Sequence, residues 1–174
     1  MTNHNYKGAL QNKIFDIISK ASTDLGVDSY VIGGFVRDLI LGRGEPKDVD
    51  VVAAGNGIEL AQKVADLLPR KPKVQVFKNY GTAMLRAFNM EIEFVGARKE
   101  SYSEESRNPE VESGTLEDDQ NRRDFTINAM AISLNEKTFG QLLDPFNGLE
   151  DLKLKVHQPT IFKVARSIIL CCFL

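Results

Sequence analysis

Apolar residues recur at helical spacing in three segments of the first half of the chain. In the first segment, Leu10, Ile14 and Ile18 fall on one face of a helix that Gly26 would end. The apolar face of the last segment stops before Pro69, which cannot continue a helix. The pattern predicts helices over residues 10–25, 35–41 and 58–68.

Short runs rich in β-branched residues alternate with these helices and continue after them. Such runs, bounded by glycine, asparagine and proline, are typical of strands. The connections at Asn79–Gly81 and Asn89–Met90 are short enough for antiparallel hairpins. The predicted strands cover residues 29–32, 49–54, 74–77, 82–88, 92–97, 131–134 and 141–143.

Residues 99–120 show no apolar periodicity and are strongly acidic. The segment holds eight acids against two bases, Lys99 and Arg107. We therefore expect a mobile surface loop here. Residues 122–130, which follow it, have the composition of a helix.

The charge balance limits the kinds of partner that the chain can hold by itself. Its net charge is −2 and its pI is about 5.8, whereas a protein that grips a long phosphate backbone is usually basic. Cys171 and Cys172 are adjacent, which favours a reduced, cytoplasmic setting. The N-terminus has no apolar signal core, and the apolar tail from Ser167 to Leu174 is too short to span a bilayer, so no membrane association is expected.

A predicted strand runs into Gly33 and Gly34, and a predicted helix with Arg37 and Asp38 follows. Glycines at such a turn let the backbone approach a phosphate, and the helix start offers free N–H groups. Arg37, one turn further on, could add a charged fork to a triphosphate. The alternative for the two glycines alone is a simple tight turn.

Two pairs of acids occupy alternate positions in predicted strands, so the members of each pair share a face. Asp48 and Asp50 would repel each other there unless a divalent cation such as Mg²⁺ lay between them. Glu91 and Glu93 form the second pair, and Glu93 is the better candidate for a third carboxylate because Phe94 and Val95 follow it. The alternatives are turn-capping aspartates and a solvated edge strand.

A further motif places Arg122 and Arg123 beside Asp124. Two arginines next to an aspartate can clamp a ribose and a phosphate. The alternative is a helix cap held by a salt bridge.

Three segments taken together resemble the class II tRNA nucleotidyltransferase and bacterial poly(A) polymerase family. The first reads VIGGFVRDLILGRGEPKDVDVVAAG from Val31 to Gly55, and the second reads NRRDFTINAM from Asn121 to Met130. The third reads DPFNGLEDL from Asp144 to Leu152. The resemblance covers about residues 28–152 and implies an α+β fold of the polymerase-β-like nucleotidyltransferase head, with a mixed, mostly antiparallel sheet backed by helices.

The resemblance also implies roles for individual residues. Asp48 and Asp50 would hold catalytic Mg²⁺, with Glu93 assisting. The residues that would contact the incoming ATP or CTP are Gly33, Gly34, Arg37, Arg122, Arg123, Asp124 and Asn128. The acceptor would be the 3′ end of a tRNA or another RNA, and addition of CCA or of poly(A) stays open.

The chain departs from the family after residue 152. Residues 153–174 do not show the acidic and arginine motif that selects the base, so we expect a truncated or abnormal start of the neck after a head domain at 1–152. The apolar tail from Ile168 to Leu174 could support self-association. Two other hypotheses stay open, namely an inactive fragment that binds Mg²⁺ and nucleotide, and a nucleotidyltransferase that acts on a non-RNA acceptor.

Overall fold

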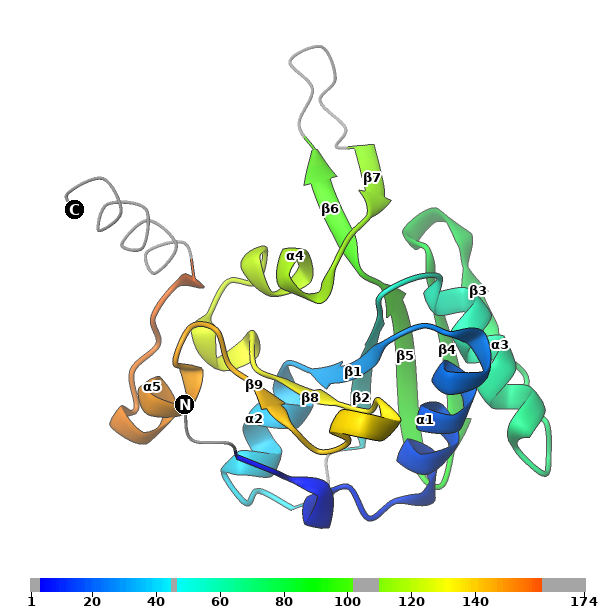
Figure 1. Ribbon diagram of the computed structural model, residues 1–174, viewed down its shortest axis with the longest axis horizontal. Helices are drawn as coiled ribbons and strands as arrows, with labels where there is room; N and C mark the ends of the chain where they lie inside the picture. The colour runs from blue at the N-terminus through cyan, green and yellow to red at the C-terminus, as the bar shows by residue number, and fades with distance from the viewer. Residues whose placement is uncertain (1–3, 45–46, 102–109, 161–174) are drawn as a thin grey trace.

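A seven-stranded sheet forms the centre of the computed structural model, which describes residues 4–44, 47–101 and 110–160 (Figure 1). Its strand order is β3-β4-β5-β2-β1-β8-β9, and all neighbours are antiparallel except β2 and β5. The α+β fold with a mostly antiparallel sheet is therefore confirmed. The strands are β1 (Ser29–Ile32), β2 (Asp48–Ala53), β3 (Gln75–Phe77), β4 (Thr82–Ala87), β5 (Met90–Gly96), β8 (Ala131–Ser133) and β9 (Leu142–Leu143).

Local capping chemistry sets the ends of the two longer helices, α1 (Lys13–Leu25) and α3 (Gly57–Leu67). The side chain of Asn12 accepts a hydrogen bond from the Ile14 N–H at the start of α1, and Gly26 ends it in the left-handed conformation. Asn56 caps α3 in the same way. Helix α1 begins later than the apolar pattern suggests, because the buried Leu10 lies ahead of the Asn12 cap.

The sheet has one thick and one thin apolar layer. Side chains of α1, α3 and α2 (Gly34–Ile40) pack with Val31, Val49 and Val51 in the main core. Alternate strand residues, Ile32 and Val52 among them, form a small cluster on the opposite face. Strand side chains alternate between faces, so Asp48 and Asp50 lie on the face with the small cluster.

The acidic segment is more ordered than a loop, so that prediction is wrong in part. Backbone pairing joins β6 (Arg98–Ser101) to β7 (Glu110–Ser113) in a two-stranded sheet. Helix α4 (Leu116–Asn121) follows, started by a capping box between Thr115 and Asp118. The predicted helix over 122–130 is also wrong, because Phe125 is extended and only Thr126–Asn128 forms a 3₁₀ turn.

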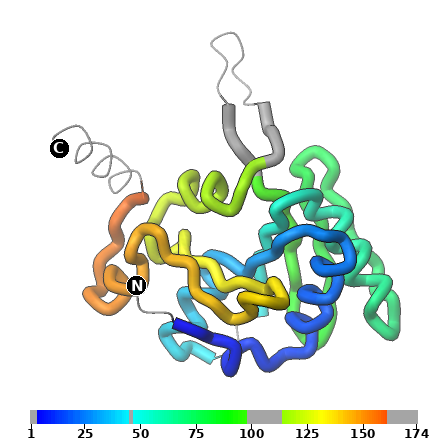
Figure 2. Tube along the Cα trace, in the orientation of Figure 1, coloured from blue at the N-terminus to red at the C-terminus, as the bar shows by residue number. Residues whose placement is uncertain are grey.

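The last described helix, α5 (Gly148–Leu154), leads to a segment in which Pro159 forms an antiparallel bridge with Phe125. Asn5 forms an antiparallel bridge with Gln141, so the N-terminal segment lies along the β9 side of the molecule (Figure 2). The described part of the chain contains no helix long and apolar enough for a membrane span. The expected apolar tail from Ile168 to Leu174 lies outside the described residues.

Candidate nucleotide and metal site

The parallel pair of strands brings the predicted carboxylates to one face of the sheet. Asp48 lies opposite Glu91, and Asp50 lies opposite Glu93. Asp48 and Glu93 are exposed, whereas Asp50 is half-buried beside its β1 partner Ile32. The sequence predicts Glu93 as a third carboxylate beside Asp48 and Asp50, and the β2–β5 register places it opposite Asp50.

Glu91 and Glu93 differ in their surroundings. Glu91 accepts a hydrogen bond from Arg86 Nε at 2.6 Å across the β4–β5 hairpin, so its charge is compensated by an exposed arginine. Glu93 faces Met84 of β4 on one side and Asp50 on the other. Of the two glutamates, Glu93 is therefore the one whose charge bears on the aspartates.

The half-buried carboxyl of Asp50 is in an unfavourable environment for a negative charge. Burial raises its pKa, Arg123 acts in the opposite direction, and the carboxylates of Glu93, Asp119 and Asp48 raise it further. These hard oxygen donors suit Mg²⁺, and a cation beside them would relieve the repulsion. Among the described residues, however, no three histidine, cysteine, aspartate or glutamate side chains are already drawn together as a metal-binding group.

Gly33 occupies the turn between β1 and α2 with a positive φ of 81°. A β-carbon there would lie 2.9 Å from Nη1 of Arg123 and 3.6 Å from Oδ2 of Asp50. At Gly34 the nearest group would be the guanidinium of Arg37, at 3.6 Å. The glycine turn therefore leaves room for two arginines and an aspartate that come from three separate parts of the sequence.

Arg37 is held in place by neighbouring side chains. Its Nε and Nη2 each donate to the Asp38 carboxylate at 3.0 Å, and its Nη1 donates to Oδ1 of Asn128 at 2.8 Å. Hydrogen bonding from Arg37 lowers the pKa of Asp38 despite some burial, and Arg43 adds to the lowering. The structure thus joins Arg37 and Asn128, two residues predicted to contact nucleotide, across 91 positions of sequence.

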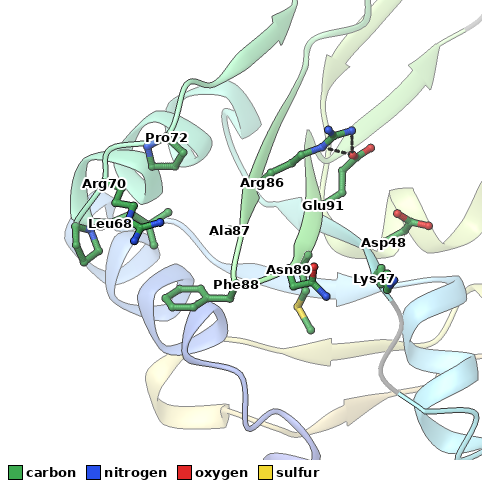
Figure 3. A pocket seen from close by; sticks show the side chains of 12 residues that line it. Lys47, Asp48, Leu68, Arg70, Pro72, Arg86, Ala87, Phe88, Asn89 and Glu91 are labelled. Atoms are coloured by element: carbon green, nitrogen blue, oxygen red, sulfur yellow. Dashed lines mark hydrogen bonds and ion pairs between the residues drawn. The ribbon is translucent and has the colours of Figure 1, made fainter.

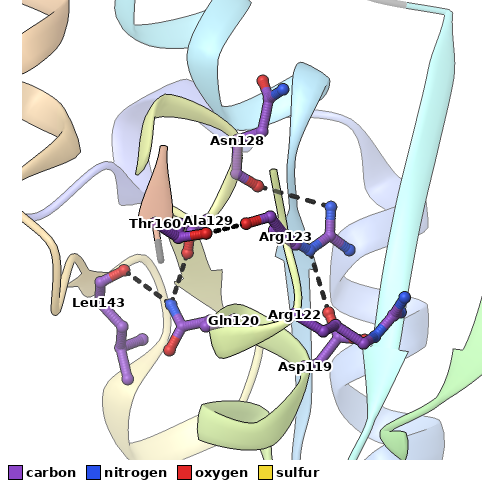
Figure 4. A network of polar contacts seen from close by, with 8 residues as sticks. All are labelled: Asp119, Gln120, Arg122, Arg123, Asn128, Ala129, Leu143 and Thr160. Carbon is purple, nitrogen blue, oxygen red and sulfur yellow. Dashed lines mark hydrogen bonds and ion pairs between the residues drawn. The ribbon is translucent and has the colours of Figure 1, made fainter. Parts of the chain in front are cut away.

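The partner of the two arginines is Asp119 rather than Asp124 (Figure 4). Arg122 donates from Nε at 2.9 Å to one carboxylate oxygen, and Arg123 donates from Nε at 3.0 Å to the other. Asp119 is fully buried, whereas the Asp124 side chain is exposed. Asp119 was not among the residues predicted from the sequence, although its position three and four residues before the arginines is a usable signal.

The third family segment is tied to the same region by backbone and side-chain bonds. Asp144 accepts from the N–H groups of Gly148 and Leu149 at 2.7 and 2.9 Å, which starts α5. The Thr126 hydroxyl donates to buried Asp151 at 2.6 Å. Thr160 in turn donates its N–H to the carbonyl of Asp124 and its hydroxyl to that of Arg123, so residues after α5 brace the arginine pair.

Carboxylates on a central parallel strand pair, next to a glycine turn and paired arginines, are the arrangement of a nucleotidyltransferase head domain. Comparison with known proteins leads to the same class. The chain belongs to the family described as the poly A polymerase head domain, which matches residues 29–157.

The chain is similar to the A-adding tRNA nucleotidyltransferase of Aquifex aeolicus, with 48% identity over 130 residues, 74% of this chain and 15% of that protein. It is 36% identical to the CC-adding tRNA nucleotidyltransferase of Deinococcus radiodurans over 83% of this chain and 37% of that protein. These relatives are enzymes, and the chain spans well under half of their length.

Solved structures give the same result. The crystal structure of a tRNA nucleotidyltransferase with a primer tRNA and an incoming ATP analogue is 41% identical, with a TM-score of 0.71 over 82% of this chain and 38% of that one. A CCA-adding enzyme in an apo form is 36% identical, with a TM-score of 0.78 over 92% of this chain and 39% of that one.

Proposed function

We propose that the chain binds a nucleoside triphosphate with Mg²⁺ and, in its complete enzyme, transfers the nucleotidyl group to a tRNA 3′ end. The observation that carries the proposal is the Asp48, Asp50 and Glu93 face beside Gly33 and Arg123. The relatives named for A and CC addition act on tRNA by name, which favours tRNA over a non-RNA acceptor.

The residues around Gly33 would bind the triphosphate. The turn leaves its backbone open, and the arginine side chains nearby are fixed before any ligand arrives, because Asp119 holds Arg122 and Arg123 and Asp38 holds Arg37. Fixed donors lose little conformational freedom when a phosphate binds. Asn128 and Asp124, on the same segment, would complete the contacts with ribose and phosphate.

Asp48 and Asp50 would hold Mg²⁺, and Glu93 would assist from β5. When bound, the metal would lower the pKa of the acceptor hydroxyl and neutralise charge on the phosphates. In the proposed reaction the RNA 3′ oxygen forms a bond to the α-phosphorus, the bond from that phosphorus to the bridging oxygen breaks, and pyrophosphate leaves. The role of the chain's own residues is to orient the triphosphate and exclude alternative geometries.

Calorimetric titration of the chain with Mg-ATP and Mg-CTP tests the binding half of the proposal. We expect a heat of binding that disappears in Asp48→Asn/Asp50→Asn. The matched control is Asp16→Asn/Asp66→Asn, which removes two exposed acids from α1 and α3. Absence of binding in the unaltered chain, or equal loss in the control, would contradict the proposal.

The transfer half needs a tRNA that lacks its CCA end and labelled CTP or ATP. We expect efficient addition from the complete enzyme and little from residues 1–174 alone, because the chain spans only part of its relatives. Comparison of CTP and ATP in the complete enzyme would also separate CC, A and CCA addition. Labelling of a non-RNA acceptor in preference to tRNA would contradict the proposed transfer to a tRNA 3′ end.

A further inference from the structure

Positive charge is concentrated in one part of this acidic chain. Residues 67–90 contain no aspartate or glutamate, whereas the whole sequence has 24 acids and 22 bases. The segment holds five cations, and all of them are exposed. Within the part of the chain that the structure describes, only Arg86 among them pairs with an acid, Glu91. The cations are Arg70, Lys71, Lys73, Lys78 and Arg86.

The same segment exposes aromatic rings. Phe77, Tyr80 and Phe88 are 42%, 69% and 44% exposed. Phe77 lies on β3, the edge strand of the sheet. Phe88 is at the tip of the β4–β5 hairpin with a φ of 49°, a conformation that bulky residues rarely adopt. A phenylalanine held there against local preference indicates a role for the ring.

A cavity of about 930 Å³ connects this segment to the metal-facing end of β2 (Figure 3). Leu68, Arg70 and Pro72 line one side, and the hairpin tip with Phe88 lines the floor. Lys47 and Asp48 lie at the other side, across Asn89. The volume falls within the range of about 300–1,000 Å³ that ligand pockets occupy, and one end of the cavity is the predicted metal site.

We propose that this surface, defined as Lys47, Arg70, Lys71, Lys73 and Phe88, binds the single-stranded 3′ segment of the RNA acceptor. Single-stranded nucleic acids are held by cations along the backbone and by aromatic rings against the bases, and both are present here. Of the two acids that line the cavity, Asp48 lies at the predicted metal site and Glu91 is paired with Arg86. The strand would pass over Phe88 and end beside Asp48. This inference rests on the proposed function, because it supplies the acceptor to the same site.

The occupant is a strand rather than a second free nucleotide, because Arg70 and Lys47 lie on opposite sides of the cavity. The triphosphate already has fixed donors at Gly33, Arg37 and Arg123. An acidic peptide could pair with the same cations but has no comparable use for exposed Phe88. The test therefore includes an acidic peptide, polyglutamate, as a competitor.

Fluorescence anisotropy of residues 1–174 with a labelled 12-nucleotide single-stranded RNA tests the surface. In Arg70→Gln/Lys71→Gln/Lys73→Gln we expect binding about tenfold weaker, with a salt slope smaller by about 2. Lys137→Gln/Lys153→Gln, which removes two exposed cations outside the segment, is the matched control and is expected to bind like the unaltered chain.

Phe88→Asn separates stacking from charge. Asparagine tolerates a positive φ, so the hairpin keeps its fold, and we expect about tenfold weaker binding with an unchanged salt slope. Equal affinity of all variants, or equal binding of a polyglutamate chain as competitor, would overturn the inference. Mg-ATP titration of the same proteins distinguishes failure of this inference from failure of the proposed function. If the unaltered chain binds Mg-ATP but not RNA, the RNA surface is rejected and the nucleotide site stands. If it binds RNA but not Mg-ATP, the nucleotide site is rejected and the RNA surface stands.

Discussion

Nη1 of Arg123 lies 2.9 Å from the position that a β-carbon would take on Gly33. The arginine cannot easily give way, because its Nε is bonded to buried Asp119. A glycine in the first family segment and an arginine in the second thus depend on each other.

Gly33→Ala is expected to destabilise the chain by about 1–2 kcal/mol and to weaken Mg-ATP binding. The first effect comes from a side chain at positive φ, and the second from displacement of Arg123. Gly26→Ala is the matched control, since Gly26 has a φ of 67° with nothing within 4 Å of its β-carbon position. Urea unfolding and calorimetry of both variants would measure the two effects. If both lost nucleotide binding equally, the contact with Arg123 would not be the cause.

Asp119→Asn is expected to lower the free energy of unfolding by about 2 kcal/mol, because two arginines lose a charged acceptor inside the molecule. Nucleotide affinity should fall as well, since Arg122 and Arg123 become free to move. Asp124→Asn serves as the comparison, because the Asp124 side chain is exposed and does not hold the arginines. A stable Asp119→Asn variant with full affinity would contradict this account of the network.

Asp50→Asn is expected to raise the free energy of unfolding by about 1 kcal/mol at pH 7 in the presence of EDTA, while abolishing Mg²⁺-dependent binding. Burial and neighbouring acids raise the pKa of Asp50 in the folded state. The ionised carboxylate therefore costs stability at neutral pH, and the cost vanishes as the pH falls below the ordinary value of about 4. Chemical denaturation at pH 7 and pH 3.5 would show the difference, with Asp66→Asn as an exposed control. A destabilised variant at pH 7 would be the contrary result.

Asp38→Asn is expected to behave in the opposite way. Arg37 lowers the pKa of Asp38 in the folded state, so the carboxylate stabilises the fold above about pH 4 and loses this contribution as the pH falls through its lowered pKa. The variant should be about 0.5–1 kcal/mol less stable than the unaltered chain at pH 7. The difference should shrink towards pH 2 in urea titrations. Glu136→Gln, which changes an exposed acid between β8 and β9, should show no such trend.

Much of the sheet could be predicted from the sequence because its apolar runs are short and clearly bounded. The β1 range and the β4–β5 hairpin agree with the structure to within a few residues. The sharing of one strand face by Asp48 and Asp50, and by Glu91 and Glu93, could be predicted from the alternation of strand residues alone. That Asp50 and Glu93 face each other could not be predicted in this way, because parallel pairing of residues 43 positions apart leaves no local signal.

The segment after residue 97 was harder to predict for physical reasons. Backbone pairing of β6 with β7 needs no apolar stripe, so periodicity did not reveal it. Residues 122–130 have helical composition, yet Phe125 forms an antiparallel bridge with Pro159, and Thr126 donates to the carbonyl of Gln158. These bonds to a distant segment hold Phe125 extended and outweigh local propensity.

The parallel pairing of β2 with β5 also determines when the carboxylate site can form during folding. Strands β2 and β5 are separated in the sequence by α3, β3 and β4, so they can pair only after this connection has been synthesised. Closing so long a loop is slow compared with forming a hairpin. During synthesis, Asp48 and Asp50 therefore emerge well before Glu93 can lie beside Asp50. The repulsion among these acids therefore arises only once the sheet that stabilises their arrangement has formed.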